Sequence, residues 1–363
     1  MRFKIAFLIA AALPLISAAD LQWMTLPNDQ FEVDGLPAYK ENGGLLIRLP
    51  LALKTVVRPE VWSLSQSPSG GRIRFRTNSK KLAIRLEYPG APNMANMHAF
   101  GQTGVDAYVD GTYISTAVAD KDSGKTKVNE KQYFDFSAKP VAMREIVLYL
   151  PLYKGVKVLG IGIDADAKLA PAKKFSLPLP VVFYGTSITQ GGCASRSGMS
   201  YQAILGRKLN IDFVNLGFSG NGKGEPEMAA AVAAIPASAY VLDFSQNNGT
   251  LESVAQVYGP FLDTVRKKNP NTPIVAITPI YMSRESSLEA SAPDVESMRV
   301  HIRKVVSQRI AAGDANLQLV EGTDLLGPTQ GDGLVDGSHP NDLGFQWMAD
   351  GLAGRFRKLL SLR

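Results

Sequence analysis

The pattern of apolar residues changes near Pro180, and this change limits the possible folds more than any other feature of the sequence. Before Pro180, apolar and polar side chains mostly alternate, for example over residues 72–87 and 105–110. Such alternation is typical of strands that bury one face. Glycine, proline and asparagine residues separate these short strands. Residues 20–166 are therefore predicted to form an antiparallel β-sandwich, similar to a jelly roll.

After Pro180, short, mostly apolar runs alternate with segments of helical spacing. The apolar runs are residues 181–184, 213–216, 239–244, 274–279 and 317–320. The helices are predicted over residues 199–209, 226–235, 251–268, 293–312 and 343–360. Because the strands of a parallel sheet are buried on both faces, they are apolar throughout. Residues 181–363 are therefore predicted to form an α/β domain with a parallel sheet, and the proline-containing residues 167–180 are predicted to be a linker.

The first residues have the features of a secretory signal peptide. Arg2 and Lys4 precede an apolar run over residues 5–16, and the small residues 17–19 follow it. This run is too short to cross a bilayer, and no later segment has about 18 consecutive apolar residues. We therefore expect residues 1–19 to be removed on export to the periplasm or the extracellular space, and the rest of the chain not to insert stably into a membrane. An uncleaved anchor is the alternative interpretation.

Charge and cysteine content limit the classes of partner and site. The chain has 39 lysines and arginines against 33 aspartates and glutamates, and this excess of +6 is spread along the sequence. A dispersed excess is a weak indication of nucleic-acid binding, so we expect no nucleic-acid partner. Cys193 is the single cysteine, which excludes an internal disulfide and a zinc site made of several cysteines. We expect Cys193 to be buried as a small apolar side chain.

Candidate catalytic residues follow the first three apolar runs. In a doubly wound sheet, ligands bind at the carboxyl ends of the strands, so the loops that leave these runs are the first places to search. Ser187, Gly220 and Asn247 lie in these loops. The serine can present its hydroxyl, the glycine can direct its backbone N–H at a ligand, and the asparagine can donate its side-chain amide. Taken singly, each residue also fits a helix cap or an ordinary turn.

Three histidines offer few candidates for a general base near neutral pH. His301 lies at the edge of the apolar stripe of a predicted helix, and His98 lies in a loop of the predicted sandwich. His339 lies between the last strand and the last helix, three residues after Asp336. Asp336 can hold the Nδ1 proton of the imidazole and leave Nε2 free to accept a proton from a hydroxyl. The alternative is that Asp336 is a turn residue and His339 begins the last helix.

Taken together, these segments resemble the four sequence blocks of the SGNH hydrolases, also called GDSL esterases, which carry serine, glycine, asparagine and histidine in this order. Residues 184–193 and 336–345 are similar to a branch of that family whose N-terminal β-sandwich carries a Gly-x-Asp-Leu-Tyr signature. The signature here is Gly104-Val105-Asp106-Ala107-Tyr108, with alanine in place of leucine. The resemblance covers nearly all of the chain after the predicted signal peptide.

Two positions depart from the family pattern. Thr186 replaces the aspartate of the usual Gly-Asp-Ser, and Asn248 replaces the aspartate that commonly follows the oxyanion asparagine. Both changes leave the catalytic atoms in place, and we expect them to alter the support of the loops.

The resemblance implies a flavodoxin-like, three-layer α/β domain that acts as a serine hydrolase. At the matching positions, Ser187 is the nucleophile, His339 is the base, and Asp336 orients the imidazole. The backbone N–H groups of Ser187 and Gly220 and the side-chain amide of Asn247 are implied to form the oxyanion hole. Neither a metal nor an organic cofactor is required.

The sequence says less about the substrate than about the catalytic residues. The four segments contain no long apolar run suited to a fatty-acyl tunnel, so we expect a short acyl group such as acetyl. Exported members of the family often remove acetyl groups from polysaccharides, which makes an acylated carbohydrate the favoured substrate. The alternatives are a lipase-like esterase or an acyltransferase with another substrate, and a glycan-binding protein whose hydrolase domain is inactive.

Two further residues are candidate substrate contacts. Arg196 lies in the loop that follows Ser187, and His98 lies in the other predicted domain. We expect His98, or a neighbour in its loop, to reach over the active site from the sandwich; these neighbours are Asn93, Met94, Asn96 and Met97. The sequence carries no signal for the oligomeric state.

Overall fold

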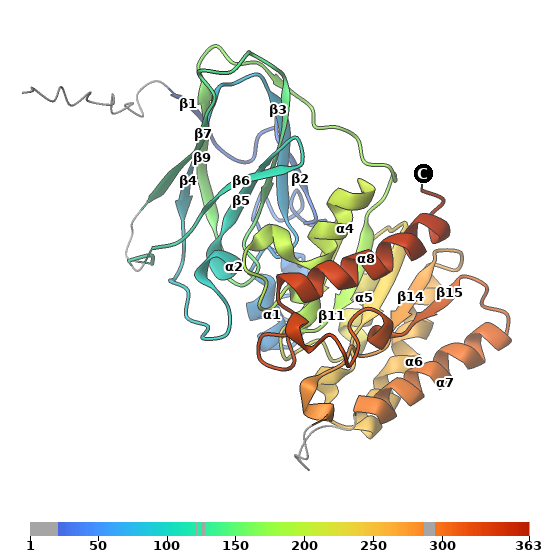
Figure 1. Cartoon of the computed structure of the whole chain (residues 1–363). Helices are drawn as coiled ribbons and strands as arrows, with labels where there is room; N and C mark the ends of the chain where they lie inside the picture. Colours follow the sequence, from blue (N-terminus) through green and yellow to red (C-terminus); the bar gives the residue numbers. More distant parts are fainter. Residues whose placement is uncertain (1–20, 121, 125–127, 287–294, 363) are drawn as a thin grey trace, which may run out of the picture.

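The computed structural model describes residues 21–362, apart from 121, 125–127 and 287–294. The predicted signal peptide, residues 1–19, lies outside the described residues. The chain forms a β-rich unit and an α/β unit that lie side by side (Figure 1). No helix within the described part of the chain has both the length and the apolar composition needed to cross a membrane.

Two antiparallel sheets make up the β-rich unit. The first has the strand order β1 (Leu21–Met24), β9 (Lys157–Asp164), β4 (Lys81–Glu87) and β7 (Asn129–Asp135). The second has the order β10 (Leu169–Ala170), β3 (Arg72–Thr77), β8 (Arg144–Tyr149), β5 (Val105–Val109) and β6 (Thr112–Ala117), and β2 (Glu32–Asp34) also pairs with β3. Alternate residues of both sheets, such as Ile73 and Ile84, are fully buried in one core. The predicted antiparallel sandwich is confirmed, and β10 lies within the segment predicted as a linker.

Two short helices of the β-rich unit were not predicted. They are α1 (Pro59–Ser65) and α2 (Ala99–Thr103). Helices of 7 and 5 residues are too short for a helical repeat of apolar residues to be recognised in the sequence. Proline at the first position of α1 is a local start signal that this reasoning missed.

A five-stranded parallel sheet forms the centre of the α/β unit. Its strand order is β12 (Phe213–Gly217), β11 (Val181–Gly185), β13 (Ala239–Asp243), β14 (Ile274–Ile277) and β15 (Leu317–Val320). The first strand in sequence thus lies between the second and the third, which is the flavodoxin-like order. The predicted parallel sheet and its three-layer class are confirmed.

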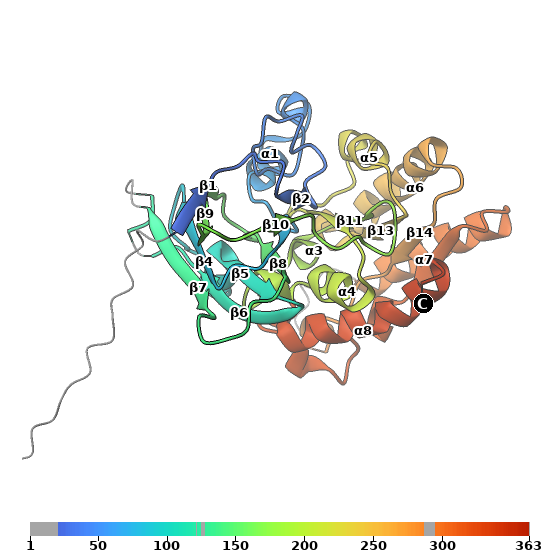
Figure 2. The same ribbon diagram turned by 90° about the horizontal axis from the view of Figure 1, so that it is seen from above.

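Helices cover both faces of this sheet (Figure 2). Val181 and Phe183 point to the face covered by α4 (Tyr201–Leu209) and α8 (Asp342–Leu359). Val182 and Tyr184 point to the opposite face, which is covered by α5 (Pro226–Ala233), α6 (Leu251–Lys268) and α7 (Val295–Ala311). Because both faces are buried, β11 and β14 have no charged or amide side chain. Strands β12, β13 and β15 each include one, namely Asn215, Asp243 and Gln318, and Gln318 is exposed on the edge strand.

The Gly-x-Asp-x-Tyr signature lies where the β-rich unit meets the loop that follows the first strand of the α/β unit. Asp106 is fully buried, and its Oδ2 accepts hydrogen bonds from the Gly198 N–H at 2.8 Å and from the Arg196 guanidinium at 3.0 Å. Arg196 also donates to the Tyr108 hydroxyl at 2.6 Å and stacks 3.8 Å from the centre of the Tyr113 ring. The structure therefore assigns Arg196 to the contact between the two units, and not to the substrate contact expected from its position after Ser187.

We expect Asp106→Ala to lower the free energy of unfolding by about 3 kcal/mol, because it leaves the partly buried Arg196 guanidinium and the Gly198 N–H without their acceptor. Urea unfolding followed by circular dichroism measures the loss. Glu130→Ala is the matched control, since it breaks an exposed ion pair with Arg85 and is expected to cost less than about 1 kcal/mol. Equal small losses in the two variants would contradict the role assigned to the signature.

Candidate active site

Ser187 lies at the point where strand β11, which is paired between β12 and β13, turns into the short helix α3 (Ser187–Gln190). The turn requires glycine at 185, because a Cβ there would lie 2.0 Å from Thr189 Oγ1 and 2.3 Å from the Asp243 carbonyl oxygen. Thr186 caps the helix, and its side-chain oxygen accepts from the Ile188 N–H at 3.3 Å. Thr186 thus supports the turn where the family usually has aspartate.

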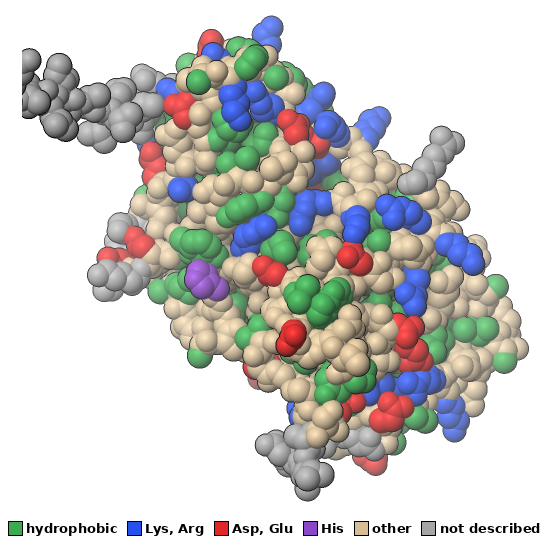
Figure 3. Space-filling model, in the orientation of Figure 1, with side chains coloured by type: hydrophobic (Ala, Val, Ile, Leu, Met, Phe, Trp, Pro, Cys, Tyr) green, Lys and Arg blue, Asp and Glu red, His purple; other side chains and the backbone are tan. Residues whose placement is uncertain are grey.

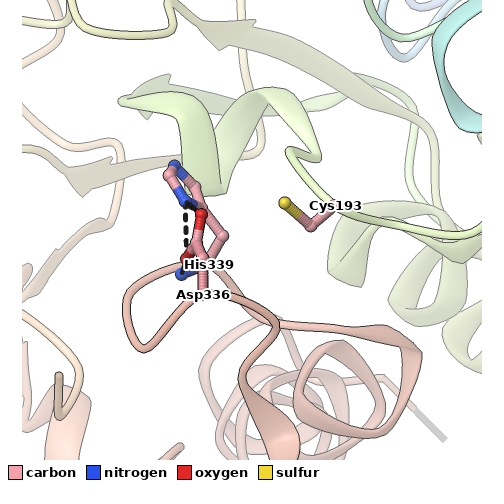
Figure 4. Close-up of side chains that lie close together, drawn as sticks. All are labelled: Cys193, Asp336 and His339. Carbon is pink, nitrogen blue, oxygen red and sulfur yellow. Dashed lines mark hydrogen bonds and ion pairs between the residues drawn. The ribbon is translucent and has the colours of Figure 1, made fainter. Parts of the chain in front are cut away.

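The structure brings Ser187, His339 and Asp336 together. The Ser187 hydroxyl oxygen lies 2.8 Å from Nε2 of His339. On the other side of the ring, Nδ1 of His339 lies 2.8 Å from Oδ2 of Asp336 (Figure 4). An ionised carboxylate only accepts hydrogen bonds, so Nδ1 carries the proton and Nε2 is free to accept from the hydroxyl. This arrangement can remove a proton from Ser187 and return it to a leaving group.

Asp336 is held as a carboxylate by a set of donors. Its Oδ1 accepts from the backbone N–H groups of Ser338 at 3.1 Å and His339 at 2.9 Å. Partial burial by itself would raise the pKa of Asp336, but the hydrogen bonds from the His339 backbone, from the Asn96 side chain and from the imidazole lower it to about 2. Asp336 is therefore ionised across the pH range in which an imidazole titrates.

Part of the loop around His98 reaches this site, as expected, although His98 itself is not the residue that does so. Nδ2 of Asn96 donates to Oδ2 of Asp336 at 2.9 Å. His98 caps the N-terminus of α2: its Nδ1 accepts from the Phe100 N–H at 3.3 Å, and its ring packs edge-on against the Phe100 ring. Among the described residues, no contact joins His98 to the triad of Ser187, His339 and Asp336. The structure thus assigns His98 to a helix cap.

The loops after the two neighbouring strands flank Ser187. Gly185 of β11 is in register with Gly217 of β12 and with Asp243 of β13, so the chain leaves all three strands at the same edge of the sheet. Gly220, in the loop after β12, has a φ of +68°, a conformation that glycine adopts without strain. Neither the Gly220 N–H nor the Ser187 N–H donates to another described residue. Both are available to a ligand.

Asn247 lies in the loop after β13 and has the amide expected of an oxyanion donor. Its Oδ1 is buried and has no hydrogen-bond partner, and its Nδ2 donates to no other described residue. The next residue, Asn248, replaces the family aspartate, and its Nδ2 donates to the Lys223 carbonyl at 2.9 Å. Asn248 thus ties the loop after β13 to the loop after β12.

Two supporting residues were missed by the sequence reasoning. Arg48 is 1% exposed, and its guanidinium donates to the carbonyl oxygens of Gly217, of Leu64 at 2.7 Å and of Ser67 at 2.9 Å. Burial lowers its pKa to about 9. Because Gly217 is the last residue of β12 and directly precedes the loop that carries Gly220, Arg48 fixes the start of that loop. An arginine within the apolar run 45–49 was the available signal.

Asp243, at the end of β13, is the second missed residue. Its Oδ2 accepts from Thr189 Oγ1 and from the Tyr201 hydroxyl, both at 3.0 Å. Burial raises the pKa of Asp243 to about 7, and the two hydrogen bonds partly oppose this shift. Asp243 therefore braces α3, the helix that begins with Ser187.

Cys193 is buried, as expected, and lies beside the triad (Figure 4). Its Sγ, a carboxylate oxygen of Asp336 and a ring nitrogen of His339 lie within 4.8 Å of one another, a spacing that a metal ion can accept. Burial and the charge of Asp336 raise the pKa of the thiol to about 12, however, and a thiol must lose its proton to ligate a metal. Asp336 and His339 are also hydrogen-bonded to each other. The donor set thus favours an acid–base pair over a metal site.

Two profiles of known protein families match the sequence of this chain. The sequence profile of the GDSL-like lipase/acylhydrolase family matches residues 179–357, and the profile of the N-terminus of SGNH hydrolase-type esterases, which carries the GxDLY signature, matches residues 21–169. A comparison with curated proteins gave no significant match.

Several solved structures share the fold over most of this chain. A GDSL-like lipase from Bacteroides ovatus is 30% identical, with a TM-score of 0.84 over 94% of this chain and 99% of that chain. A salicylyl-acyltransferase from a tetracycline biosynthetic pathway is 22% identical, with a TM-score of 0.80 over 96% of this chain and all (100%) of the other. An acetyl xylan esterase from the rumen bacterium Butyrivibrio proteoclasticus is 16% identical, with a TM-score of 0.57 over 81% of this chain and 91% of that one. The chain therefore belongs to the GDSL-like, or SGNH, lipase/acylhydrolase family, in the branch with a GxDLY N-terminal domain.

Proposed function

We propose that this protein is an exported serine esterase that removes short acyl groups, acetyl above all, from carbohydrates. The observation that carries the proposal is the hydrogen-bonded chain from the Ser187 hydroxyl through His339 to Asp336, with 2.8 Å at each end of the imidazole. Export is proposed from the features of residues 1–19.

In the first half of the reaction, the Ser187 hydroxyl oxygen attacks the ester carbonyl carbon while Nε2 of His339 takes its proton. Asp336 stabilises the imidazolium that forms. The negative charge that develops on the carbonyl oxygen is bound by the N–H groups of Ser187 and Gly220 and by the amide of Asn247. The tetrahedral intermediate collapses, the imidazolium gives its proton to the leaving alcohol oxygen, and the acyl group stays on Ser187.

In the second half, a water molecule takes the place of the alcohol. His339 accepts a proton from this water, and the resulting oxygen attacks the acyl carbon of the acyl-enzyme. The same donors bind the second oxyanion, and the imidazolium returns a proton to the Ser187 oxygen as the acid leaves. Every step uses groups of this chain and water.

The surroundings of the triad favour a polar alcohol over a lipid. The side chains of His339 and Asp336 are 26% and 32% exposed, so the triad lies open to bulky substrates. The neighbouring exposed groups include the amide of Asn96 and the backbone of Gly220, which suit a substrate rich in hydroxyl groups. The shared fold with an acetyl xylan esterase supports the same substrate class.

Acyl transfer is the second candidate function, because the fold is shared over almost the full length with a salicylyl-acyltransferase. Transfer requires that water be kept from the acyl-enzyme. The exposure of His339 and Asp336 favours hydrolysis, since water reaches the imidazole directly.

We propose no nucleic-acid partner. On the face shown in Figure 3, lysines and arginines are interspersed with aspartates and glutamates rather than gathered in one basic patch. Dispersed positive charge gives a phosphate backbone no continuous surface to follow.

We expect the enzyme to hydrolyse 4-nitrophenyl acetate at least about 10-fold faster than 4-nitrophenyl octanoate, since each discriminating contact with an acyl chain contributes about 1–3 kcal/mol. Mass spectrometry of acetylated oligosaccharides before and after incubation tests the carbohydrate substrate through the loss of acetyl groups. Faster cleavage of octanoate, with acetylated oligosaccharides unchanged, would contradict the proposal and favour a lipase-like enzyme. Products acylated on an added alcohol, without free acid, would favour an acyltransferase.

A further inference from the structure

The loop between β4 and α2 of the sandwich is built to hold a fixed shape. The buried side chain of Gln102 bonds four backbone groups of this loop: its Oε1 accepts from the N–H groups of Asn93 at 2.8 Å and Met94 at 3.0 Å, and its Nε2 donates to the carbonyl oxygens of Met94 at 3.1 Å and Met97 at 2.6 Å. A buried amide that is satisfied in this way rigidifies the segment around it. The loop is therefore preorganised before any substrate binds.

The same loop is anchored to the α/β unit. Met97 is 4% exposed and belongs to the apolar core that contains Ala194, which lies in the loop after α3. Gly101 of α2 lies so close to that loop that a Cβ would be 2.2 Å from the Ala194 carbonyl oxygen. Asn96 lies between Met94 and Met97, and Gln102 bonds the backbone of both. The position of Asn96 is thus fixed relative to the hydrolase residues.

Asn96 donates from Nδ2 to Oδ2 of Asp336, the oxygen that also accepts the Nδ1 proton of His339. The amide group is neutral. It therefore orients the carboxylate without adding a charge beside the imidazole. The titratable groups against Asp336 are His339 on its own loop and Cys193 in the loop after α3, and the sandwich contributes the neutral amide.

We propose that Asn96 is a positioning residue for the Asp336–His339 pair, so that the sandwich domain contributes directly to turnover. This inference rests on the proposed function of the triad. The amide fixes the carboxylate at the angle that keeps the imidazole aimed at Ser187, and it stabilises the ionised form that the imidazolium needs. The sandwich then acts as part of the catalytic apparatus in addition to any part it has in holding a glycan.

The test uses the full chain and 4-nitrophenyl acetate, which is too small to depend on glycan contacts. We expect Asn96→Ala to lower kcat by about 10-fold with KM changed less than about twofold, because the Asp336 carboxylate loses the hydrogen bond that fixes its orientation. Asn93→Ala is the matched control: Asn93 is an exposed asparagine of the same loop whose Oδ1 accepts from Lys154 and not from the triad, and its kcat is expected to stay within about twofold.

Asn96→Asp separates positioning from simple loop support. It keeps the shape of the side chain but places a second carboxylate against Asp336, which favours the imidazolium. We therefore expect the acidic limb of the pH profile of kcat/KM to move to higher pH by at least about half a unit, a change that a merely structural role would not cause. An unshifted profile together with a kcat for Asn96→Ala within twofold of the wild type would overturn the inference.

A spectroscopic readout keeps the inference testable if the wild type does not hydrolyse esters, which would count against the proposed function instead. A histidine Nδ1 proton bonded to a carboxylate gives a far-downfield proton NMR signal. We expect Asn96→Ala to shift or broaden this signal of His339 and Asn93→Ala to leave it unchanged. An unchanged signal in Asn96→Ala would show that the amide does not act on the pair.

Discussion

Ser187→Ala is expected to lower kcat for 4-nitrophenyl acetate by at least about 10⁴-fold while KM changes little. The substitution removes the one oxygen that lies 2.8 Å from Nε2 of His339, so no acyl-enzyme can form. Because the Ser187 hydroxyl bonds only His339 among the described side chains, its loss is expected to cost little stability. Steady-state kinetics with purified protein measures the loss, and the thermal unfolding midpoint is expected to stay close to that of the wild type.

Ser195→Ala is the matched control for this prediction. Ser195 lies in the loop after α3, and its hydroxyl donates to Asp342 rather than to the triad. Its kcat is expected to stay within about threefold of the wild type, as for an exposed side chain outside the site. Turnover by Ser187→Ala close to that of the control would mean that another group is the nucleophile.

Asn247→Asp is expected to lower kcat by at least about 10³-fold, and Asn247→Ala by about 10²- to 10³-fold. The alanine variant removes one donor from the oxyanion hole. The aspartate variant keeps the shape but turns that donor into a negatively charged acceptor, which repels the charge on the carbonyl oxygen. The order of the two losses is therefore the sharper test, because a role in folding alone does not predict that the isosteric variant is the worse one.

Asn248→Ala is the control for the loop. Asn248 is the next residue, and its Nδ2 donates to the Lys223 carbonyl, so this amide supports the loop. We expect less than about a 10-fold loss of kcat in this variant, from looser support of the loop. Comparable losses in Asn248→Ala and Asn247→Asp would show that the loop, and not the amide of Asn247, matters for turnover.

Features with a local sequence signal were predicted closely. Helix α6 was predicted over 251–268, and the structure has it there, because Val254, Tyr258, Phe261 and Val265 repeat at helical spacing after the cap Thr250. The strands of the parallel sheet were recognised because both of their faces are buried. Ser187 and His339 are 152 positions apart, and only the resemblance to a family predicts that they lie together.

Features that depend on contacts between distant segments were not predictable from periodicity. Arg48 and the Gly217 carbonyl are 169 positions apart, and Asn96 and Asp336 are 240 positions apart. Hydrophobic patterns report which face of an element is buried, but they do not report what a buried polar group bonds to. Arg196 is an example. Its place near Ser187 in the sequence suggests a substrate contact, whereas in the structure its guanidinium forms an ion pair with Asp106 of the sandwich.

Labelling with a fluorophosphonate, followed by peptide mass mapping, tests the central claim most directly, since such reagents react with a serine whose proton is taken by a neighbouring base. The account predicts one adduct per chain, located on Ser187, formed rapidly in the wild type and at least about 10²-fold more slowly in His339→Gln, which lacks the base. An adduct on a different residue, or an equal rate of labelling in His339→Gln, would contradict the claim that Ser187 and His339 act together.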